Sequence, residues 1–250
     1  MALGDSFTEG LDDPSADGNY CGWADRFAAK MSANNPEFRY ANLAIRGRCI
    51  APIVDEQVPV AIAMNPDLVS LAGGINDALR PKFSMEATAN ELETAVIALR
   101  ASGADVMLWA FGDPSRRSTT LGTIKNRMRD FREITIAIAA DHDCYVVDLW
   151  PERLYDDSRV WAEDRLHLNA LGHERTACAA MEVLGLGDHE WAALLEDPHP
   201  MKPIERARGH LEWTGKHLAP WIGRRINRRS SGDGIVPKRD RLEPVDYLVS

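Results

Sequence analysis

The sequence predicts an α/β fold with a parallel sheet covered by helices on both faces. Five short apolar runs are predicted strands, at 2–5, 38–43, 67–72, 105–111 and 144–149. Segments with helical spacing separate them, and another follows the last run. Strands that alternate with helices in this way form parallel sheets between two helix layers. Ligands of such open sheets bind at the carboxyl ends of the strands.

The predicted helices are segments 20–32, 52–64, 84–102, 123–140 and 169–184. In the first of them, Trp23 and Phe27 share one face. Pro59 lies inside the second and should interrupt it, because proline lacks the backbone donor that a helix needs. Ser84 and Asn169 are predicted N-caps, since their side-chain oxygens can accept a hydrogen bond from the first helical turn.

The chain changes character near residue 195. We predict one α/β domain over 1–195 and a Pro- and Arg-rich extension over 196–250. Trp213 and Trp221 suggest that the extension packs on the body, with a short helix at 205–217. The extension carries a net charge of +5 on the segment 198–250, and the rest of the chain carries −14.

This charge distribution bears on possible partners. An acidic body is a poor general nucleic-acid binder, so no nucleic-acid partner is predicted. The basic extension is either a solvated face or a contact for phosphate or anionic lipid. No apolar stretch is long enough to cross a membrane, and the start MALGDSFTEG lacks the pattern of a secretory signal. We therefore expect a cytoplasmic location.

The four cysteines show neither C-x-x-C pairing nor zinc-finger spacing with histidine. They are predicted to be reduced thiols, and no metal or other cofactor is predicted.

Candidate hydrogen-bond donors follow three of the predicted strands. Ser6, in Gly-Asp-Ser, comes directly after the first strand, Gly47 follows the second, and Asn76 follows Gly-Gly at the end of the third. Each pattern has an ordinary interpretation, because Gly-Asp-Ser is a common turn and Gly-Gly-Ile-Asn-Asp can simply cap a helix. Together, however, the backbone N–H groups of Ser6 and Gly47 and the amide of Asn76 offer three donors for a tetrahedral oxyanion.

A serine nucleophile also needs a base and an orienting acceptor. Asp164 and His167 are three residues apart, which allows the carboxylate to hold Nδ1–H while Nε2 faces Ser6. Alone, an aspartate near a histidine is weak evidence.

In combination, the segments GDSFTEG, N-L-A-x-x-G, GGIND and D-R-L-H resemble, in this order, the four sequence blocks of the SGNH (GDSL-type) hydrolases. The resemblance covers residues 1–185 and is closest to the bacterial lipase/esterase branch. It implies a flavodoxin-like three-layer α/β/α fold with a five-stranded parallel sheet. It also implies a metal-free triad of Ser6, His167 and Asp164, with Ser6, Gly47 and Asn76 as the oxyanion hole.

Further residues are assigned supporting roles. Asp5 and Asp77 are expected to order the loops through backbone amides. Trp161 is a candidate for the pocket wall, although an aromatic residue is more often core. Arg46 and Arg80 could bind an acidic substrate, or they could pair with the acidic surface.

The predicted function is hydrolysis of small-molecule carboxylic esters with short acyl or acetyl groups. The absence of a long apolar lid in the sequence disfavours a lipase that acts on insoluble fat. The alternative is a non-catalytic binding or scaffold protein that uses its basic extension. Phosphate chemistry at Ser6 is disfavoured because the sequence has no glycine-rich phosphate loop.

Overall fold

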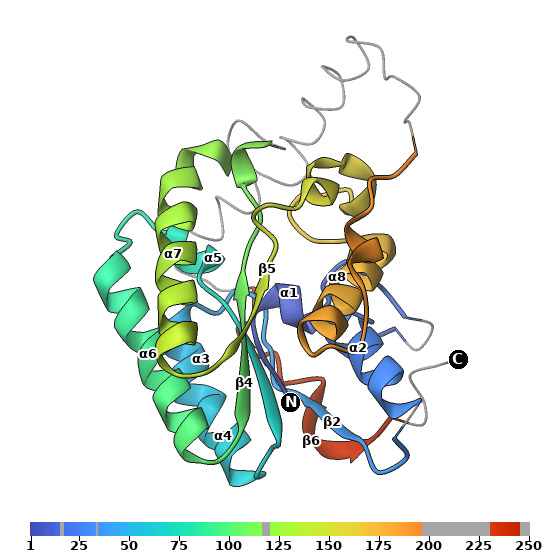
Figure 1. The fold of residues 1–250 in the computed structure, drawn as a ribbon. Coiled ribbons are helices and arrows are strands. Elements are labelled where there is room, and N and C mark those ends of the chain that lie inside the picture. Colours follow the sequence, from blue (N-terminus) through green and yellow to red (C-terminus); the bar gives the residue numbers. More distant parts are fainter. Residues whose placement is uncertain (16–17, 34, 117–120, 197–230, 246–250) are drawn as a thin grey trace.

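A central sheet organises the computed structural model, which describes residues 1–15, 18–33, 35–116, 121–196 and 231–245 (Figure 1). Within these residues the strand order is β5-β4-β3-β1-β2-β6. The strands are β1 (Ala2–Gly4), β2 (Arg39–Asn42), β3 (Leu68–Ala72), β4 (Asp105–Ala110), β5 (Tyr145–Asp148) and β6 (Arg239–Pro244). The first five strands run parallel, in the 2-1-3-4-5 order of flavodoxin-like folds.

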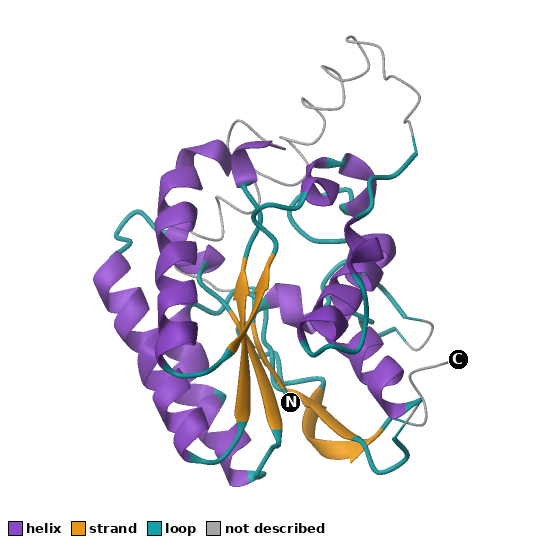
Figure 2. Cartoon of the chain, viewed as in Figure 1, coloured by secondary structure: helices purple, strands orange, loops and turns teal. Residues whose placement is uncertain are grey.

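Two helix layers cover the sheet (Figures 1 and 2). One layer consists of α3 (Ile50–Glu56), α4 (Val58–Ala63), α6 (Met85–Ala101) and α7 (Lys125–Asp141). The other is built mainly from α2 (Trp23–Ser32) and α8 (Ala170–Val183). The short helices α1 (Ser6–Glu9) and α5 (Ile75–Ala78) follow β1 and β3 directly. The predicted three-layer α/β/α architecture is therefore confirmed.

Alternating side chains of the strands supply two separate cores. Leu3, Leu71 and Leu108 point into the layer of α3, α4, α6 and α7. Met107 and Trp109 point into the layer of α2 and α8. Strands buried on both faces have this near-continuous apolar composition, which is why the five runs were recognisable in the sequence.

Pro59 has the predicted effect on the second helix. The chain forms α3 and α4 instead of one helix, and Pro59 lies in the first turn of α4, where its missing N–H costs no helical hydrogen bond. Ser84 and Asn169 also act as predicted, because their side chains accept hydrogen bonds from the N–H groups of Ala87 and Gly172.

The sixth strand corrects the prediction of a five-stranded sheet. β6 lies in the C-terminal extension and pairs antiparallel with β2, so β6 becomes the edge strand on that side of the sheet. The strand reads RDRLEP and lacks the apolar run that marks a buried strand. An edge strand tolerates such charged residues, because one side of it faces solvent. The extension's predicted helix at 205–217 lies outside the described residues, so the division into 1–195 and 196–250 stays a prediction.

No helix in the described part of the chain is both long and apolar enough to span a bilayer. All four cysteines are partly buried and belong to no disulfide, as expected for reduced thiols.

Candidate active site

Ser6 lies where the direction of chain progression across the sheet reverses. β1 has β2 on one side and β3 on the other, and Gly4 at its end is in register with Ala72 at the end of β3. Ser6 and Asn76 follow these two strand ends, so residues 70 positions apart meet at one edge of the sheet. Crevices at such switch points are the usual ligand sites of open α/β sheets.

His167 faces Ser6 from the loop before α8. Its Nε2 is 2.9 Å from the Ser6 hydroxyl oxygen, and its Nδ1 is 2.6 Å from Asp164 Oδ2. Asp164 Oδ1 accepts the backbone N–H groups of Leu166 and His167 at 2.9 and 3.0 Å. This tight turn, with Arg165 in the left-handed conformation (φ 56°), fixes the carboxylate against the ring. The structure thus brings together the three residues predicted from GDS and DRLH.

Asp164 and His167 stabilise each other's charged forms. Burial disfavours the ionised form of Asp164, but the hydrogen bond and charge of His167 outweigh it and hold the pKa of Asp164 below its ordinary value. Burial likewise disfavours the imidazolium of His167. Asp12 and Asp164 outweigh that effect and raise the pKa of His167 to about 9. The unperturbed value for histidine is about 6.5.

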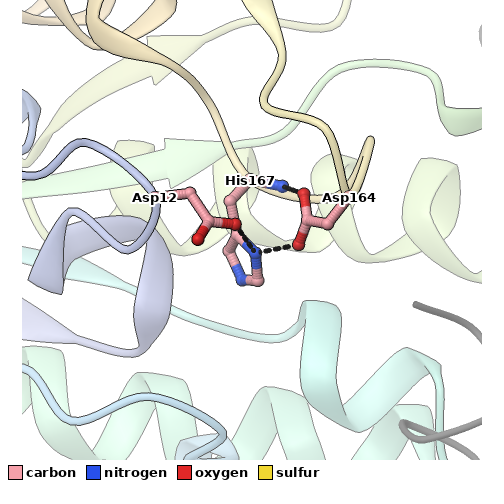
Figure 3. A group of neighbouring side chains, drawn as sticks. All are labelled: Asp12, Asp164 and His167. Atoms are coloured by element: carbon pink, nitrogen blue, oxygen red, sulfur yellow. Dashed lines mark hydrogen bonds and ion pairs between the residues drawn. The ribbon is translucent and has the colours of Figure 1, made fainter. Parts of the chain in front are cut away.

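Asp12 is a site residue that the sequence prediction missed. Its Oδ2 lies 3.5 Å from His167 Nδ1, the same nitrogen that donates to Asp164 (Figure 3). The two carboxylates belong to different loops, one after α1 and the other before α8 (Figure 3). Asp12 and His167 are 155 positions apart in the sequence, so no local pattern predicts this contact.

Asp12, Asp164 and His167 are also a group of side chains whose ligand atoms lie close enough to hold a metal ion. Asp164 is ionised and can only accept, however, so its 2.6 Å contact requires a proton on His167 Nδ1. A metal would have to displace that proton, because a ligating imidazole nitrogen must be deprotonated. The donor set therefore fits an imidazole held by carboxylates better than a metal centre.

Two backbone donors belong to residues that line the region beside the Ser6 hydroxyl. Ser6 and Gly47 both line a polar cavity there, and neither backbone N–H has an acceptor among the described residues. Gly47 adopts φ 77°, a conformation that glycine accepts without steric cost. These N–H groups match two of the three donors predicted for an oxyanion.

The third predicted donor, Asn76, is already engaged. Its Nδ2 donates to Asp5 Oδ2 at 2.9 Å and to the Arg48 carbonyl at 3.1 Å. These bonds tie the turn before Ser6 to the loop that contains Gly47. Asn76 therefore holds the two backbone donors in place in this structure, instead of presenting two unengaged N–H bonds.

Asp5 and Asp77 both bond to backbone amides, as expected of loop-ordering residues. Asp5 caps α1 by accepting the N–H of Phe7, and burial raises the pKa of Asp5 to about 6. Asp77 accepts the N–H of Ile50 at the start of α3, directly after the Gly47 loop. Burial also raises the pKa of Asp77 above its ordinary value.

Ser6 and His167 stand between two cavities of different character. One has a volume of about 120 Å³ and a mostly apolar wall that includes Phe7, Ile75, Phe111, Ile124, Met128 and Trp161. The other, of about 630 Å³, is wider and more polar, and its wall includes Asp12, Tyr20, Gly47, Asp164 and Ser231. Trp161 thus lines a cavity, as the sequence analysis suggested.

The two arginines proposed for substrate binding do not line either cavity. Arg46 forms an ion pair with the buried carboxylate of Glu9, and its guanidinium lies 5.0 Å above the ring of Tyr20. Arg80 is exposed, and its carbonyl accepts a hydrogen bond from Arg127. Arg46 therefore follows the alternative left open by the sequence, pairing with an acidic residue of its own chain.

The C-terminal extension also reaches the site. Ser231 lines the polar cavity, and Gly232 packs so closely on the Arg46 carbonyl that an added Cβ would lie 2.3 Å from it. Lys238 Nζ donates to the carbonyls of Glu9 and Tyr20, at either end of the loop that carries Asp12. These contacts could not be predicted from local sequence patterns, because they join residues more than 180 positions apart.

Comparisons with known proteins place these features in a family. Axe2, an acetylxylan esterase from Geobacillus stearothermophilus, superposes with a TM-score of 0.62 at 21% identity, over 78% of this chain and 95% of that one. LAE5, an α/β hydrolase from the metagenome of Lake Arreo in Spain, gives 0.62 at 21% identity, over 75% and 94%. TesA gives 0.60 at 21% identity, over 73% and 96%. At such identities the likeness establishes the fold.

No curated protein sequence matches the chain significantly. The sequence profile of the GDSL-like lipase/acylhydrolase family, however, matches residues 2–175, a stretch that contains all four motifs. The chain therefore belongs to the GDSL-like lipase/acylhydrolase family and is a carboxylic-ester hydrolase.

Proposed function

We propose that Ser6, His167 and Asp164 form a catalytic triad that hydrolyses small carboxylic esters with short acyl groups through an acyl-enzyme. The observation that carries this proposal is the hydrogen-bonded chain from the Ser6 hydroxyl through both ring nitrogens of His167 to Asp164, with contacts of 2.9 and 2.6 Å. A nucleophile, a base and an orienting acceptor in this order are the requirements of such a triad.

The reaction proceeds in two stages. The Ser6 oxygen attacks the ester carbonyl as its proton passes to Nε2 of His167, and Asp164 stabilises the imidazolium that forms. The backbone N–H groups of Ser6 and Gly47 stabilise the oxyanion, and Asn76 positions them through its bonds to Asp5 and Arg48. The alcohol then leaves with the proton from His167. Water, activated by the same nitrogen, releases the acid and restores Ser6.

The apolar cavity is the proposed acyl site. An apolar cavity of 150 Å³ can hold benzene, so the 120 Å³ here accommodates about four to five carbon atoms. The wider, more polar cavity on the other side of Ser6 suits the alcohol part of the ester. Its acidic and hydroxyl-bearing wall offers hydrogen bonds to a polar leaving group.

This assignment predicts the acyl-chain preference. Among p-nitrophenyl acetate, butyrate and octanoate, we expect the butyrate to give the highest kcat/KM. Acetate leaves part of the apolar cavity unfilled, and each buried CH₂ contributes about 0.8 kcal/mol. The longer octanoyl chain exceeds the cavity.

Met128→Ala provides a matched test of the same cavity. Met128 is buried in its wall, and truncation lengthens the available space. The ratio of octanoate to acetate kcat/KM should rise several-fold, and a ratio taken within one variant cancels any loss of folded protein. A ratio that stays at the wild-type value would place the acyl chain elsewhere. No hydrolysis of any ester by the folded protein would favour a binding protein instead.

A further inference from the structure

Asp12 occupies a position that the surrounding structure holds rigidly. It has φ 70°, a left-handed conformation that is uncommon for residues other than glycine, asparagine and aspartate. The next residue, Asp13, is anchored through its ion pair with Arg26 at 2.7 Å and through its carbonyl, which accepts the N–H of Cys21. The turn is therefore fixed on the body by contacts that do not involve the Asp12 side chain.

The Asp12 carboxylate is directed at one atom of the site. Its Oδ2 lies 3.5 Å from His167 Nδ1, and Asp164 Oδ2 lies 2.6 Å from the same atom (Figure 3). The Asp12 side chain is 39% exposed, at the border of the polar cavity, whereas that of Asp164 is 14% exposed. One ring nitrogen thus has two carboxylates within ion-pair distance, where a triad needs one.

We propose that Asp12 is a second positioning carboxylate for His167. Like Asp164, it lies beside the protonated Nδ1 of the ring and stabilises the imidazolium. This inference rests on the proposed function, in which His167 is the base. Asp12 does not touch the reacting atoms and acts only through His167.

The charge balance around His167 gives the proposal a measurable consequence. Asp164 and Asp12 face the ring from two loops, Asp5 faces it from the turn after β1, and His173 faces it from α8. His173 is neutral, because burial lowers its pKa to about 3. The carboxylates outweigh the burial of the ring and raise the pKa of His167 to about 9.

The direction in which the rate changes with pH follows from this pKa of His167. Only the deprotonated imidazole can accept the Ser6 proton, so the rate should rise with pH and level off above about 9. Removing a carboxylate that faces the ring should lower this pKa and move the rise toward neutral pH.

The experiment is Asp12→Asn, with Asp143→Asn as the matched control. Asparagine tolerates the left-handed conformation as well as aspartate, so the change removes charge without adding strain. Asp143 also has a left-handed φ, 53°, and its side chain is fully exposed before β5, at the opposite end of the sheet from the site. The imidazole of His167 is titrated by NMR in each protein, with His167→Ala identifying its signal.

We expect Asp12→Asn to lower the pKa of His167 by roughly half a unit or more and Asp143→Asn to leave it unchanged. The midpoint of kcat/KM against pH should move in the same direction and by a similar amount. Because the NMR titration needs no turnover, it separates a failure of this inference from a failure of the proposed function. Equal His167 pKa values in wild type, Asp12→Asn and Asp143→Asn would overturn the inference.

A second comparison tests whether Asp12 and Asp164 act on the same nitrogen of His167. In Asp164→Asn, Asp12 remains as the charged partner of the ring, so the double variant Asp12→Asn/Asp164→Asn should lose at least a further tenfold in kcat. Asp12→Asn alone should lose only a few-fold, because Asp164 remains. Residues that share one partner show such non-additive losses. If the added loss in the double variant equals that of Asp12→Asn alone, the two carboxylates act independently and the inference is wrong.

Discussion

Ser6→Ala should lower kcat/KM for p-nitrophenyl butyrate by about a thousandfold or more. The change removes the atom that attacks the carbonyl, and loss of a nucleophile leaves only the residual effect of binding and oxyanion donors. The fold should be unaffected. The hydrogen bond that is lost joins Ser6 to His167 within the site, and alanine is well suited to the start of α1. The measurement is steady-state hydrolysis at pH 9, where about half of the wild-type base is deprotonated.

Ser32→Ala is the matched control for this variant. Ser32 ends α2 and donates only to the carbonyl of Ala29, in the same helix. The Ser32→Ala variant should retain the wild-type kcat/KM. If Ser6→Ala kept more than about a tenth of the wild-type activity, Ser6 would not be the nucleophile.

Lys238→Met should lower the free energy of unfolding by about 3–5 kcal/mol. The ammonium of Lys238 lies 2.5 Å from Oδ2 of Asp25, whose side chain is 2% exposed. It also donates to the carbonyls of Glu9 and Tyr20. The substitution removes the ion-pair partner of a buried carboxylate, and removal of one partner of a buried ion pair typically has a cost of this size. Urea unfolding at pH 7 gives the value.

Lys30→Met is the control, because it breaks an ion pair of similar length in a different environment. Lys30 is 2.7 Å from Glu174, with side-chain exposures of 36 and 39%. Exposed pairs contribute about 0–1 kcal/mol. A combined Asp25→Asn/Lys238→Met variant should recover part of the loss, since it removes the buried charge. Equal losses in Lys238→Met and Lys30→Met would show that the C-terminal contact does not stabilise the domain.

Much of the fold could be predicted because its signals are local. The five parallel strands are continuous apolar runs, and the break at Pro59 follows from one residue. The positions of Ser6 and Asn76 at the ends of two strands were equally predictable, since parallel strands bring their carboxyl ends to one edge.

The parts that the sequence did not predict depend on distant contacts or on burial. Asp12 reaches His167, and Lys238 reaches Glu9, across long separations. His173 is a case of burial: it is 1% exposed, and its Nδ1 accepts the N–H of Trp23. Helical spacing alone did not distinguish the α8 face that packs on α2. A neutral histidine with one nitrogen hydrogen-bonded can lie in such a core.

The hydrogen bonds of the Asn76 amide are a second feature that the sequence did not predict. Its place after Gly74 predicts an amide beside Ser6, and the structure places it there. Gly74 adopts φ 102°, and a Cβ there would lie 2.3 Å from the ring of Phe131, so only glycine fits this turn. Which acceptors the amide finds depends on Asp5 and the Arg48 carbonyl, which belong to other loops.

The most direct test of the triad is covalent labelling with an organophosphofluoridate, followed by peptide mass spectrometry. The account predicts one adduct per chain, on the peptide that contains Ser6, formed in the wild type and absent from Ser6→Ala. His167→Ala should label at least a hundredfold more slowly, because its serine has no base. Labelling at another residue, or at Ser6 at the same rate with and without His167, would contradict the assignment of Ser6 as a nucleophile activated by His167.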